Sequence, residues 1–230
     1  LVGRGLTLDT IKRFGLGADR HKDLGPVVTI PWVTRDGVVV GVKTRAVNPP
    51  DGHDKNHSYT GSSFGILYGS QGLPLHSDGQ PVAPDLRCLV VVEGEINALS
   101  VWQSCQGFGV DVLSVGAQSS VVNMTDGQGR WLRQWGCRLV WLDEDKPKGI
   151  DFADHLHNLV GGLRFASSMA AGLDANDLLC HGVLGRLVAG LWLRQLDDDQ
   201  SRLSVVWAVQ DVARQTGDTG LYGVVAQYLT

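Results

Sequence analysis

Two apolar runs that end in carboxylates are the sequence feature that most limits the fold of this chain. They read LVVVEGEINALS at residues 89–100 and LVWLDED at residues 139–145. A continuous apolar run of this length is typical of a strand that is buried on both faces of a parallel sheet, and ligands of such sheets bind at the carboxyl ends of the strands. We therefore expect Glu93, Asp143 and Asp145 to face one crevice.

Carboxylates that share one crevice repel one another unless a cation neutralises them. Hard oxygen ligands of this kind suit Mg²⁺ or Mn²⁺, so the two acidic turns predict a metal ion held next to phosphate. Two simpler interpretations stay open. Glu93 could be a helix N-cap acid that the helix dipole stabilises, and the Asp143 and Asp145 pair could form a solvated acidic turn or a receiver-like aspartate pocket.

The composition is typical of a soluble globular protein. Of the 230 residues, 43% are hydrophobic and 19% are charged, and no apolar run approaches the roughly 20 residues that span a bilayer. We therefore expect a cytoplasmic protein with no membrane partner and one compact body made of subdomains. The chain begins at Leu1 with no signal sequence, which suggests a fragment or a processed chain.

The cysteines and histidines do not predict a zinc site. The four cysteines lie far apart without a CxxC pair, so we expect reduced core thiols and no disulfide framework. Four histidines have no cysteine or closely spaced third ligand beside them, so satisfied or solvent-facing side chains are the simpler interpretation. These residues are Cys88, Cys105, Cys137 and Cys180, and His53, His57, His155 and His157.

Charge is distributed unevenly along the chain. Residues 1–60 hold nine Lys or Arg against six Asp, a net charge of +3, while the whole chain has −4 and the remainder therefore −7. A basic front and an acidic centre suit a protein that grips a phosphate backbone with one part and binds cations with another, although ordinary fluctuation of surface charge would give the same numbers.

The first part of the chain predicts a mixed α+β subdomain. Residues 7–17 have a capping threonine, a helical spacing of apolar residues and a closing glycine, which predict one short helix. Residues 27–33 and 38–47 are β-branched runs around an Asp-Gly turn, which predict a hairpin. Residues 48–63 are rich in Pro, Gly, Asp, His and Ser and predict a loop.

From Cys88 onward, predicted strands and helices alternate, which implies a parallel sheet with right-handed crossovers. Two further helices follow the sheet, as their apolar spacing indicates. The predicted strands are 88–92, 111–115, 138–142 and 163–166, the predicted crossover helices are 96–106, 127–135 and 151–159, and the last two helices are 184–196 and 203–215.

Four short motifs appear in a fixed order around the predicted sheet. EGE (93–95) follows its first strand, SVGA (114–117) its second and DED (143–145) its third, and DANDLL (174–179) comes after them. This order resembles the Toprim domain, which topoisomerases, DnaG-type and phage primases and several nucleases share. The DANDLL form is similar to the primases of phage primase-helicases and to those of plasmids and mobile elements.

The N-terminal segment makes the resemblance more specific. RGLTLDTIKRFGLG (4–17), the predicted hairpin and the turn FGILYG (64–69) look like the N-terminal subdomain of the primase RNA-polymerase core. Topoisomerase and nuclease members of the Toprim family are not expected to carry this lead-in. The resemblance covers about residues 4–182.

The resemblance implies an α/β fold: a Toprim parallel-sheet core, which is Rossmann-like, with an N-terminal mixed α+β subdomain and C-terminal helices. It implies a template-binding subdomain at residues 1–84, a Toprim catalytic domain at 85–182 and a helical segment at 183–230. The implied function is that of a DNA primase catalytic core. Such a nucleotidyltransferase makes short RNA primers from nucleoside triphosphates on single-stranded DNA, with two or more Mg²⁺ or Mn²⁺ ions.

The resemblance also assigns roles to the acidic residues. Glu93 matches the glutamate that acts as general acid or base at the attacking or leaving 3′-oxygen, and a carboxylate with acidic neighbours does have a raised proton affinity. Asp143 and Asp145 match the Asp-x-Asp pair that shares the cations. Asp174 and Asn176 match the third acidic element, so all five residues are predicted metal ligands.

Other residues are predicted to contact nucleotide. Gly94 and Gly116 follow strands and would let the backbone turn sharply there. Lys146 follows the acidic pair and could meet a nucleotide phosphate, or it could be an ordinary loop charge.

A basic ridge for the template is expected in the first part of the chain. Its candidates are Lys43 and Arg45, which lie two residues apart on one face of a strand, together with Lys55 and Arg20. Surface solvation alone would also explain each of these cations. Trp32 could stack a base, but a core position is the simpler interpretation.

Three positions depart from the family pattern. Asn97 stands where the family often has an aspartate, Asn176 is neutral where other members have Asp, and Leu173 stands where relatives often have a lysine. These departures leave two alternatives to primer synthesis. One is a Toprim nuclease that uses the same metals, and the other is a catalytically weak module that binds DNA or recruits a helicase.

Partners follow from the resemblance as well. Primases of this type are expected to work with a replicative helicase and with a zinc-binding domain, in cis or in trans, and no zinc site is expected within these residues. The source is expected to be a bacterium, a phage or a plasmid.

Overall fold

The computed structural model divides the chain into two compact units, Leu1–Gly72 and Leu73–Thr230, which are described separately below. It describes residues 1–116, 124–142, 147–165, 172–196 and 199–227. The division into three parts at residues 84 and 182 stays a prediction.

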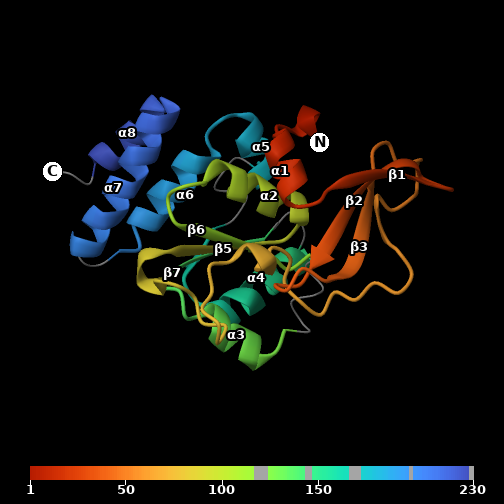
Figure 1. Ribbon diagram of the computed structural model, residues 1–230, viewed down its shortest axis with the longest axis horizontal. Helices are drawn as coiled ribbons and strands as arrows, with labels where there is room; N and C mark the ends of the chain where they lie inside the picture. The colour runs from red at the N-terminus through yellow and green to blue at the C-terminus, as the bar shows by residue number, and fades with distance from the viewer. Residues whose placement is uncertain (117–123, 143–146, 166–171, 197–198, 228–230) are drawn as a thin grey trace. The chain divides into compact units, whose positions relative to one another are not determined.

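The first unit is a short helix followed by an antiparallel sheet (Figure 1). Helix α1 (Leu8–Arg13) begins at Thr7, whose side chain accepts a hydrogen bond from the backbone N–H of Thr10. The strands lie in the order β1–β2–β3–β4. They are β1 (Gly17–His21), β2 (Gly25–Val33), β3 (Val39–Ala46) and β4 (Asn56–Ser58), and 3₁₀ turns η1 (Val2–Arg4) and η2 (Ser70–Gly72) lie near the two ends of the unit.

The predicted helix and hairpin are confirmed, but the prediction that residues 48–63 form only a loop is wrong. Strand β4 lies within that range and pairs with β3, so that Ser58 lies opposite Lys43. A polar strand of three residues carries no apolar periodicity, which is why the sequence does not reveal it. Strand β1 was not predicted either, because four of its five residues are exposed and give no apolar pattern.

The second unit is built on a parallel sheet with the strand order β6–β5–β7–β8. All five residues of β5 and all five of β6 are buried, which explains the continuous apolar runs in the sequence. The predicted parallel sheet is confirmed. Its strands are β5 (Cys88–Val92), β6 (Val110–Ser114), β7 (Cys137–Trp141) and the short β8 (Leu163–Arg164), and the 3₁₀ turn η3 (Pro84–Leu86) precedes β5.

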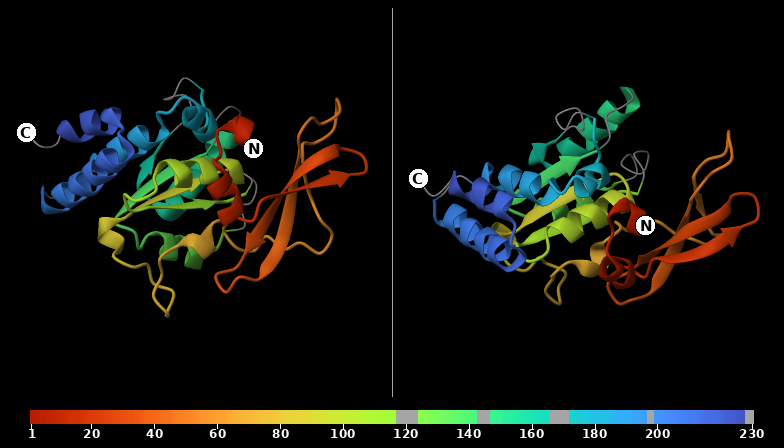
Figure 2. Two further views of the ribbon diagram at one scale, coloured as in Figure 1. Left: turned by 45° about the horizontal axis from the view of Figure 1, so that its top comes forward. Right: turned by 90° about the horizontal axis from the view of Figure 1, so that it is seen from above.

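Helices cover both faces of this sheet (Figures 1 and 2). One face carries α2 (Glu95–Ser104), α5 (Ala175–Cys180) and α6 (Leu184–Leu193), and the other carries α3 (Asp126–Leu132) and α4 (Pro147–Val160). Right-handed crossovers require this division, because the chain moves one way from β5 to β6 and then back to β7 and β8.

The C-terminal part is helical, as predicted. After α6 come α7 (Asp199–Thr216) and α8 (Thr219–Ala226), which was not predicted. Asp218 begins α8 by accepting hydrogen bonds from the backbone N–H groups of Gly220 and Leu221. Within the part of the chain that the structure describes, no helix combines the length and apolar character that a membrane span requires.

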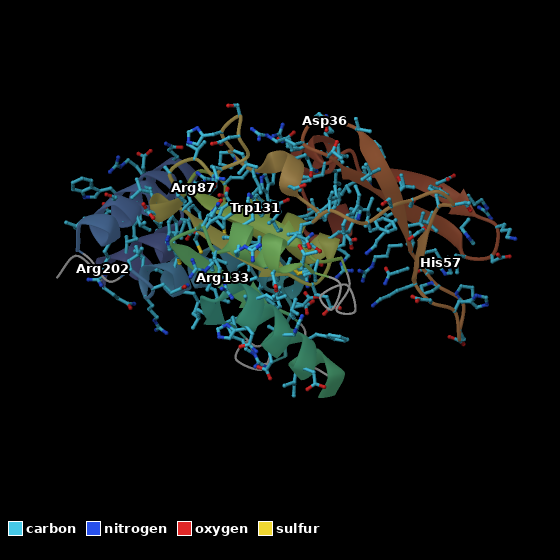
Figure 3. All side chains as sticks on the ribbon, turned by 90° about the horizontal axis from the view of Figure 1, so that it is seen from below. Asp36, His57, Arg87, Trp131, Arg133 and Arg202 are labelled. Carbon is cyan, nitrogen blue, oxygen red and sulfur yellow. The ribbon has the colours of Figure 1, made fainter. Side chains whose placement is uncertain are left out.

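A buried aspartate lies at the amino-terminal edge of the parallel sheet. Asp111 in β6 is only 4% exposed and accepts a hydrogen bond from Arg87 Nε at 2.8 Å and another from Trp135 Nε1 at 2.7 Å (Arg87 is labelled in Figure 3). Because a buried carboxylate without partners is very costly, this pairing is what permits an aspartate inside an apolar strand.

All four cysteines are free thiols. Cys88, Cys105 and Cys137 are buried around the sheet, as expected of core thiols. The expectation of a core position is wrong for Cys180, which is exposed because it lies at the end of α5 on the side that faces solvent.

Candidate active site

The carboxyl ends of β5, β6 and β7 meet at one edge of the parallel sheet. Val92, the last residue of β5, is in register with Ser114 at the end of β6 and with Trp141 at the end of β7. Glu93 follows β5 directly and is half-buried. The structure therefore puts the predicted general acid or base at the edge where ligands of parallel sheets bind.

The backbone of Glu93 is tied to the end of β6. Its carbonyl oxygen accepts hydrogen bonds from Gly116 N at 2.8 Å and from Ser114 Oγ at 2.7 Å. The same hydroxyl accepts a hydrogen bond from Gly116 N at 2.9 Å. Ser114 is fully buried. Its hydrogen bonds therefore attach the turn that contains Glu93 to the end of strand β6.

The two predicted glycines differ in their local roles. Gly116 has φ +80°, a left-handed conformation that favours glycine, so its turn requires this residue. Gly94 has φ −102°, which any residue adopts, and is the N-cap of α2. Among the described residues, a Cβ added to Gly94 would meet no atom within 4 Å, so glycine here leaves space beside Glu93.

Asp174 is the N-cap residue of α5. Its Oδ1 accepts a hydrogen bond from Asp177 N at 2.8 Å, and its own N–H donates to Asp177 Oδ2 at 3.2 Å. This reciprocal capping box explains the spacing of the two aspartates. Since the cap uses only one oxygen of the Asp174 carboxylate, the predicted metal contact would use the other.

Asn176 is joined to helix α2 inside the protein. Its side chain is 2% exposed and its Nδ2 donates a hydrogen bond to Ser100 Oγ at 3.0 Å. Ser100 in turn donates to the carbonyl oxygen of Ile96 at 2.9 Å. A contact between Asn176 and a metal would have to use its amide oxygen and stays a prediction.

Asp143, Asp145 and Lys146 lie outside the described residues. They follow β7 in the chain, and β7 ends at the same edge of the sheet as β5. No group of three or more metal-ligating side chains occurs within the ranges that the structure describes. The oxygen donors that are described, Glu93 and Asp174, suit Mg²⁺ or Mn²⁺, and a complete site would need the Asp143 and Asp145 pair as well.

The strand register of the first unit shows which of its basic residues lie on the same face of the sheet. Lys43 lies opposite Ile30, and Arg45 lies opposite Val28, so the two cations share one face. Arg20 lies opposite Pro26, whose side chain is on the same face as that of Val28, so this cation joins them. We call Lys43, Arg45 and Arg20 the basic face.

Lys55 does not join the basic face by register. Its carbonyl oxygen accepts a hydrogen bond from Ala46 N at 2.8 Å, one residue beyond the last pair of the β3–β4 ladder. Ala46 is buried on the opposite face of the sheet from Arg45. A template contact by Lys55 therefore stays a separate prediction.

Several solved structures with a similar arrangement are of primases. The primase fragment of the bacteriophage T7 primase-helicase matches with a TM-score of 0.58 and 19% identity, covering 83% of this chain and 72% of that chain. The RNA polymerase domain of the Mycobacterium tuberculosis primase DnaG matches with a TM-score of 0.59 and 15% identity, covering 97% and 84%. The chain has the fold of a primase catalytic core.

A third structure with the primase fold is a DnaG catalytic domain bound to single-stranded DNA, with a TM-score of 0.52, 15% identity and coverage of 94% of this chain and 89% of that chain. No family model matches the sequence, and no curated protein matches it either. The comparisons confirm the predicted fold class: a parallel α/β core with a mixed N-terminal unit and C-terminal helices.

Glu95 is a further carboxylate near Glu93 to which the sequence assigns no role. Glu95 stands in the first turn of α2 and is buried, two residues after Glu93. A negative charge at a helix start is stabilised by the helix dipole. The sequence shows this residue as the second glutamate of the EGE motif.

Two other sequence interpretations are settled by the structure of the first unit. Trp32 is 1% exposed and packs against Tyr68 and Phe64, so it is a core residue and has no free face for a base. The ring of His57 (Figure 3) makes a hydrogen bond through Nε2 to the carbonyl oxygen of Asp54 at 3.0 Å. This histidine, in strand β4, thus has a hydrogen-bond partner three residues earlier in the chain.

Proposed function

We propose that this chain is the catalytic core of a DNA primase and joins ribonucleotides into short RNA primers on single-stranded DNA. The observation that carries the proposal is the position of Glu93, half-buried at the carboxyl edge of a parallel sheet, in a chain with the fold of primase catalytic cores. Fold alone does not establish activity, so the chemistry of this edge is the main argument.

Glu93, Asp143, Asp145 and Asp174 would hold Mg²⁺ or Mn²⁺. These ions, when bound, neutralise the triphosphate and promote deprotonation of the attacking hydroxyl. The carboxylate of Glu93 accepts the proton of the 3′-hydroxyl or returns one to it, and the Ser114 network keeps its backbone in place. Asp174 presents its carboxylate from the start of α5.

The basic face would hold the template. Lysine and arginine side chains on one face of a sheet can contact successive backbone phosphates without reading sequence. One neighbour in fold is a primase bound to single-stranded DNA, which supports this assignment. Another is a fragment of a primase-helicase, which supports a helicase as a partner of this chain. A zinc-binding domain in cis or in trans would help to select the start site.

The experiment that tests the proposal is primer extension on a single-stranded DNA template with labelled nucleotides and Mn²⁺ or Mg²⁺. A complementary dinucleotide should be supplied, so that the lack of a start-selecting zinc domain does not decide the result. The variants are Glu93→Gln and Asp143→Ala, with Asp126→Asn as the matched control, because Asp126 is an exposed carboxylate in the first turn of α3.

Short metal-dependent products that vanish in Glu93→Gln and Asp143→Ala but persist in Asp126→Asn would establish primer synthesis. Cleavage of the template without synthesis would identify a Toprim nuclease instead. DNA binding with neither reaction would identify a recruitment module, in which Asn97, Leu173 and Asn176 mark lost catalysis.

A further inference from the structure

Lys43 is held over two aromatic rings of the first unit. Its Nζ lies 5.1 Å from the centroid of the Trp32 ring and 5.5 Å from the centroid of the Phe64 ring. The two rings meet edge to face, with centroids 5.0 Å apart and an interplanar angle of 77°. A cation within about 6 Å of a ring centroid is attracted by the quadrupole of that ring. Two such contacts restrict where the ammonium group can be.

The sequence builds this arrangement from three segments. Trp32 lies opposite Gly41 in the β2–β3 ladder, and Lys43 is two residues further on the same face. Phe64 packs against Gly41 of β3, because a Cβ added to Gly41 would lie 2.8 Å from Phe64 Cε1. Glycine at position 41 therefore makes room for the ring. Trp32 is buried against Tyr68 as well, so one of the two rings is anchored in the core.

We infer that Phe64 and Trp32 position Lys43 to bind one backbone phosphate of single-stranded DNA. This inference rests on the proposed template-binding role of the basic face and adds Phe64 to it as a positioning residue. An ammonium group is a point charge with three donors and no acceptor, which suits phosphate. Trp32 contributes by fixing the cation, because it has no exposed face on which a base could stack.

The benefit of such positioning is entropic. Ordering a flexible lysine side chain on binding costs entropy, and a side chain that is already ordered does not lose this freedom. Arg45 lies two residues along β3 on the same face, about 6.8 Å further at the usual rise of a strand. The two cations thus form a short row, in which the position of Lys43 is set by the rings.

The test measures affinity for fluorescently labelled oligo(dT) at several salt concentrations. Each phosphate contact on a single strand contributes about 0.7 to the slope of log affinity against log salt. Lys43→Met should weaken binding and reduce the slope by about 0.7, because one contact is lost. Phe64→Leu should weaken binding about two- to fivefold with the slope unchanged, because the charge remains and only its position is loosened.

Three further variants make the test specific. Phe64→Tyr keeps the ring and should bind like the native chain. Phe64→Leu in the Lys43→Met background should have no further effect, because the ring acts through the lysine. Lys22→Met is the matched control, since Lys22 is a lysine of the same unit with a side chain that is 86% exposed.

A native chain that binds DNA while Lys43→Met changes neither affinity nor slope would overturn the inference and leave the proposed function intact. Equal affinity of Phe64→Leu and the native chain, or a loss that persists in the Lys43→Met background, would overturn the positioning role. No binding of oligo(dT) by the native chain would overturn both this inference and the template-binding part of the proposed function.

Discussion

The amide nitrogen of Asn176 donates a hydrogen bond to the hydroxyl of Ser100, and both side chains are buried. This bond joins α5, which begins at Asp174, to α2, which follows Glu93 in the chain. Two of the acidic elements of the candidate site are thereby held together by a polar contact that involves neither carboxylate.

Replacing Asn176 should therefore destabilise the protein in the absence of metal. Asn176→Ala removes the donor to the buried Ser100 hydroxyl, so we expect a loss of about 0.5–1.5 kcal/mol in the free energy of unfolding. Asn176→Asp should also destabilise, because the Ser100 hydroxyl already donates to Ile96 and would face a carboxylate with only acceptors. Urea unfolding in EDTA measures both. An Asn176→Asp variant as stable as the native chain, with tighter Mn²⁺ binding, would assign this position to the metal site instead.

Ser114→Ala removes the hydroxyl that links the Glu93 carbonyl to Gly116. We expect about 1–2 kcal/mol of destabilisation and a lower rate of primer synthesis with little change in nucleotide affinity, because the turn that carries Glu93 is loosened. Rates over a range of nucleotide concentrations separate the two effects. The control is Ser63→Ala at an exposed serine of the first unit. A variant with native rates would show that the turn is held by its backbone alone.

The sequence predicts the parallel sheet well because strands that are buried on both faces must be apolar along their whole length. β5 is buried along its whole length, so its apolar run has one simple interpretation, and the carboxylate that follows must lie at the edge of the sheet. The Asn176–Ser100 contact could not be predicted, because its partners are 76 residues apart and both residue types are common on surfaces. The contact of Lys43 with the Phe64 ring could not be predicted either, because Phe64 belongs to a different segment of the chain.

The pair of Arg87 and Asp111 gives a prediction about stability. Arg87→Met removes the guanidinium from the buried Asp111 carboxylate and leaves the Trp135 donor, so the free energy of unfolding should fall by about 2–3 kcal/mol. The loss is expected below the range for fully buried pairs because the Arg87 side chain is 26% exposed. Urea unfolding measures it, and Arg87→Met combined with Asp111→Asn should recover part of it. A loss below about 0.5 kcal/mol would mean that water replaces the guanidinium.

Asp218 should make the last helix sensitive to acid. Burial acts to raise the pKa of its carboxyl, but hydrogen bonds from Arg186 and from the N–H groups of Leu221 and Gly220 outweigh burial and hold the pKa below its usual value. The carboxylate thus contributes stability at pH values above about 3.9, and this contribution is lost as the pH falls through the lower folded-state pKa.

The matched variant for this prediction is Asp218→Asn, because asparagine still caps a helix but does not titrate. Its stability deficit relative to the native chain should be under about 1 kcal/mol at pH 7, since the Arg186 pair is partly exposed, and should decrease as the pH falls below about 3.9. Thermal unfolding at pH 7, 5 and 3 compares the two proteins. A deficit that stays constant with pH would mean that the charge of Asp218 plays no part.

The thiols provide a measure of opening in the parallel sheet. Burial raises the pKa of the Cys88 and Cys105 thiols, and Cys137 is buried beside them, whereas Cys180 is exposed. Because the thiolate is the reactive form, a disulfide reagent at pH 8 should label one thiol quickly and the other three only when the sheet opens. Cys180→Ser should abolish the fast phase and leave the slow phase unchanged. Rapid labelling of Cys88 in β5 and Cys137 in β7 would show that these strands separate easily, which is incompatible with a rigid edge for Glu93.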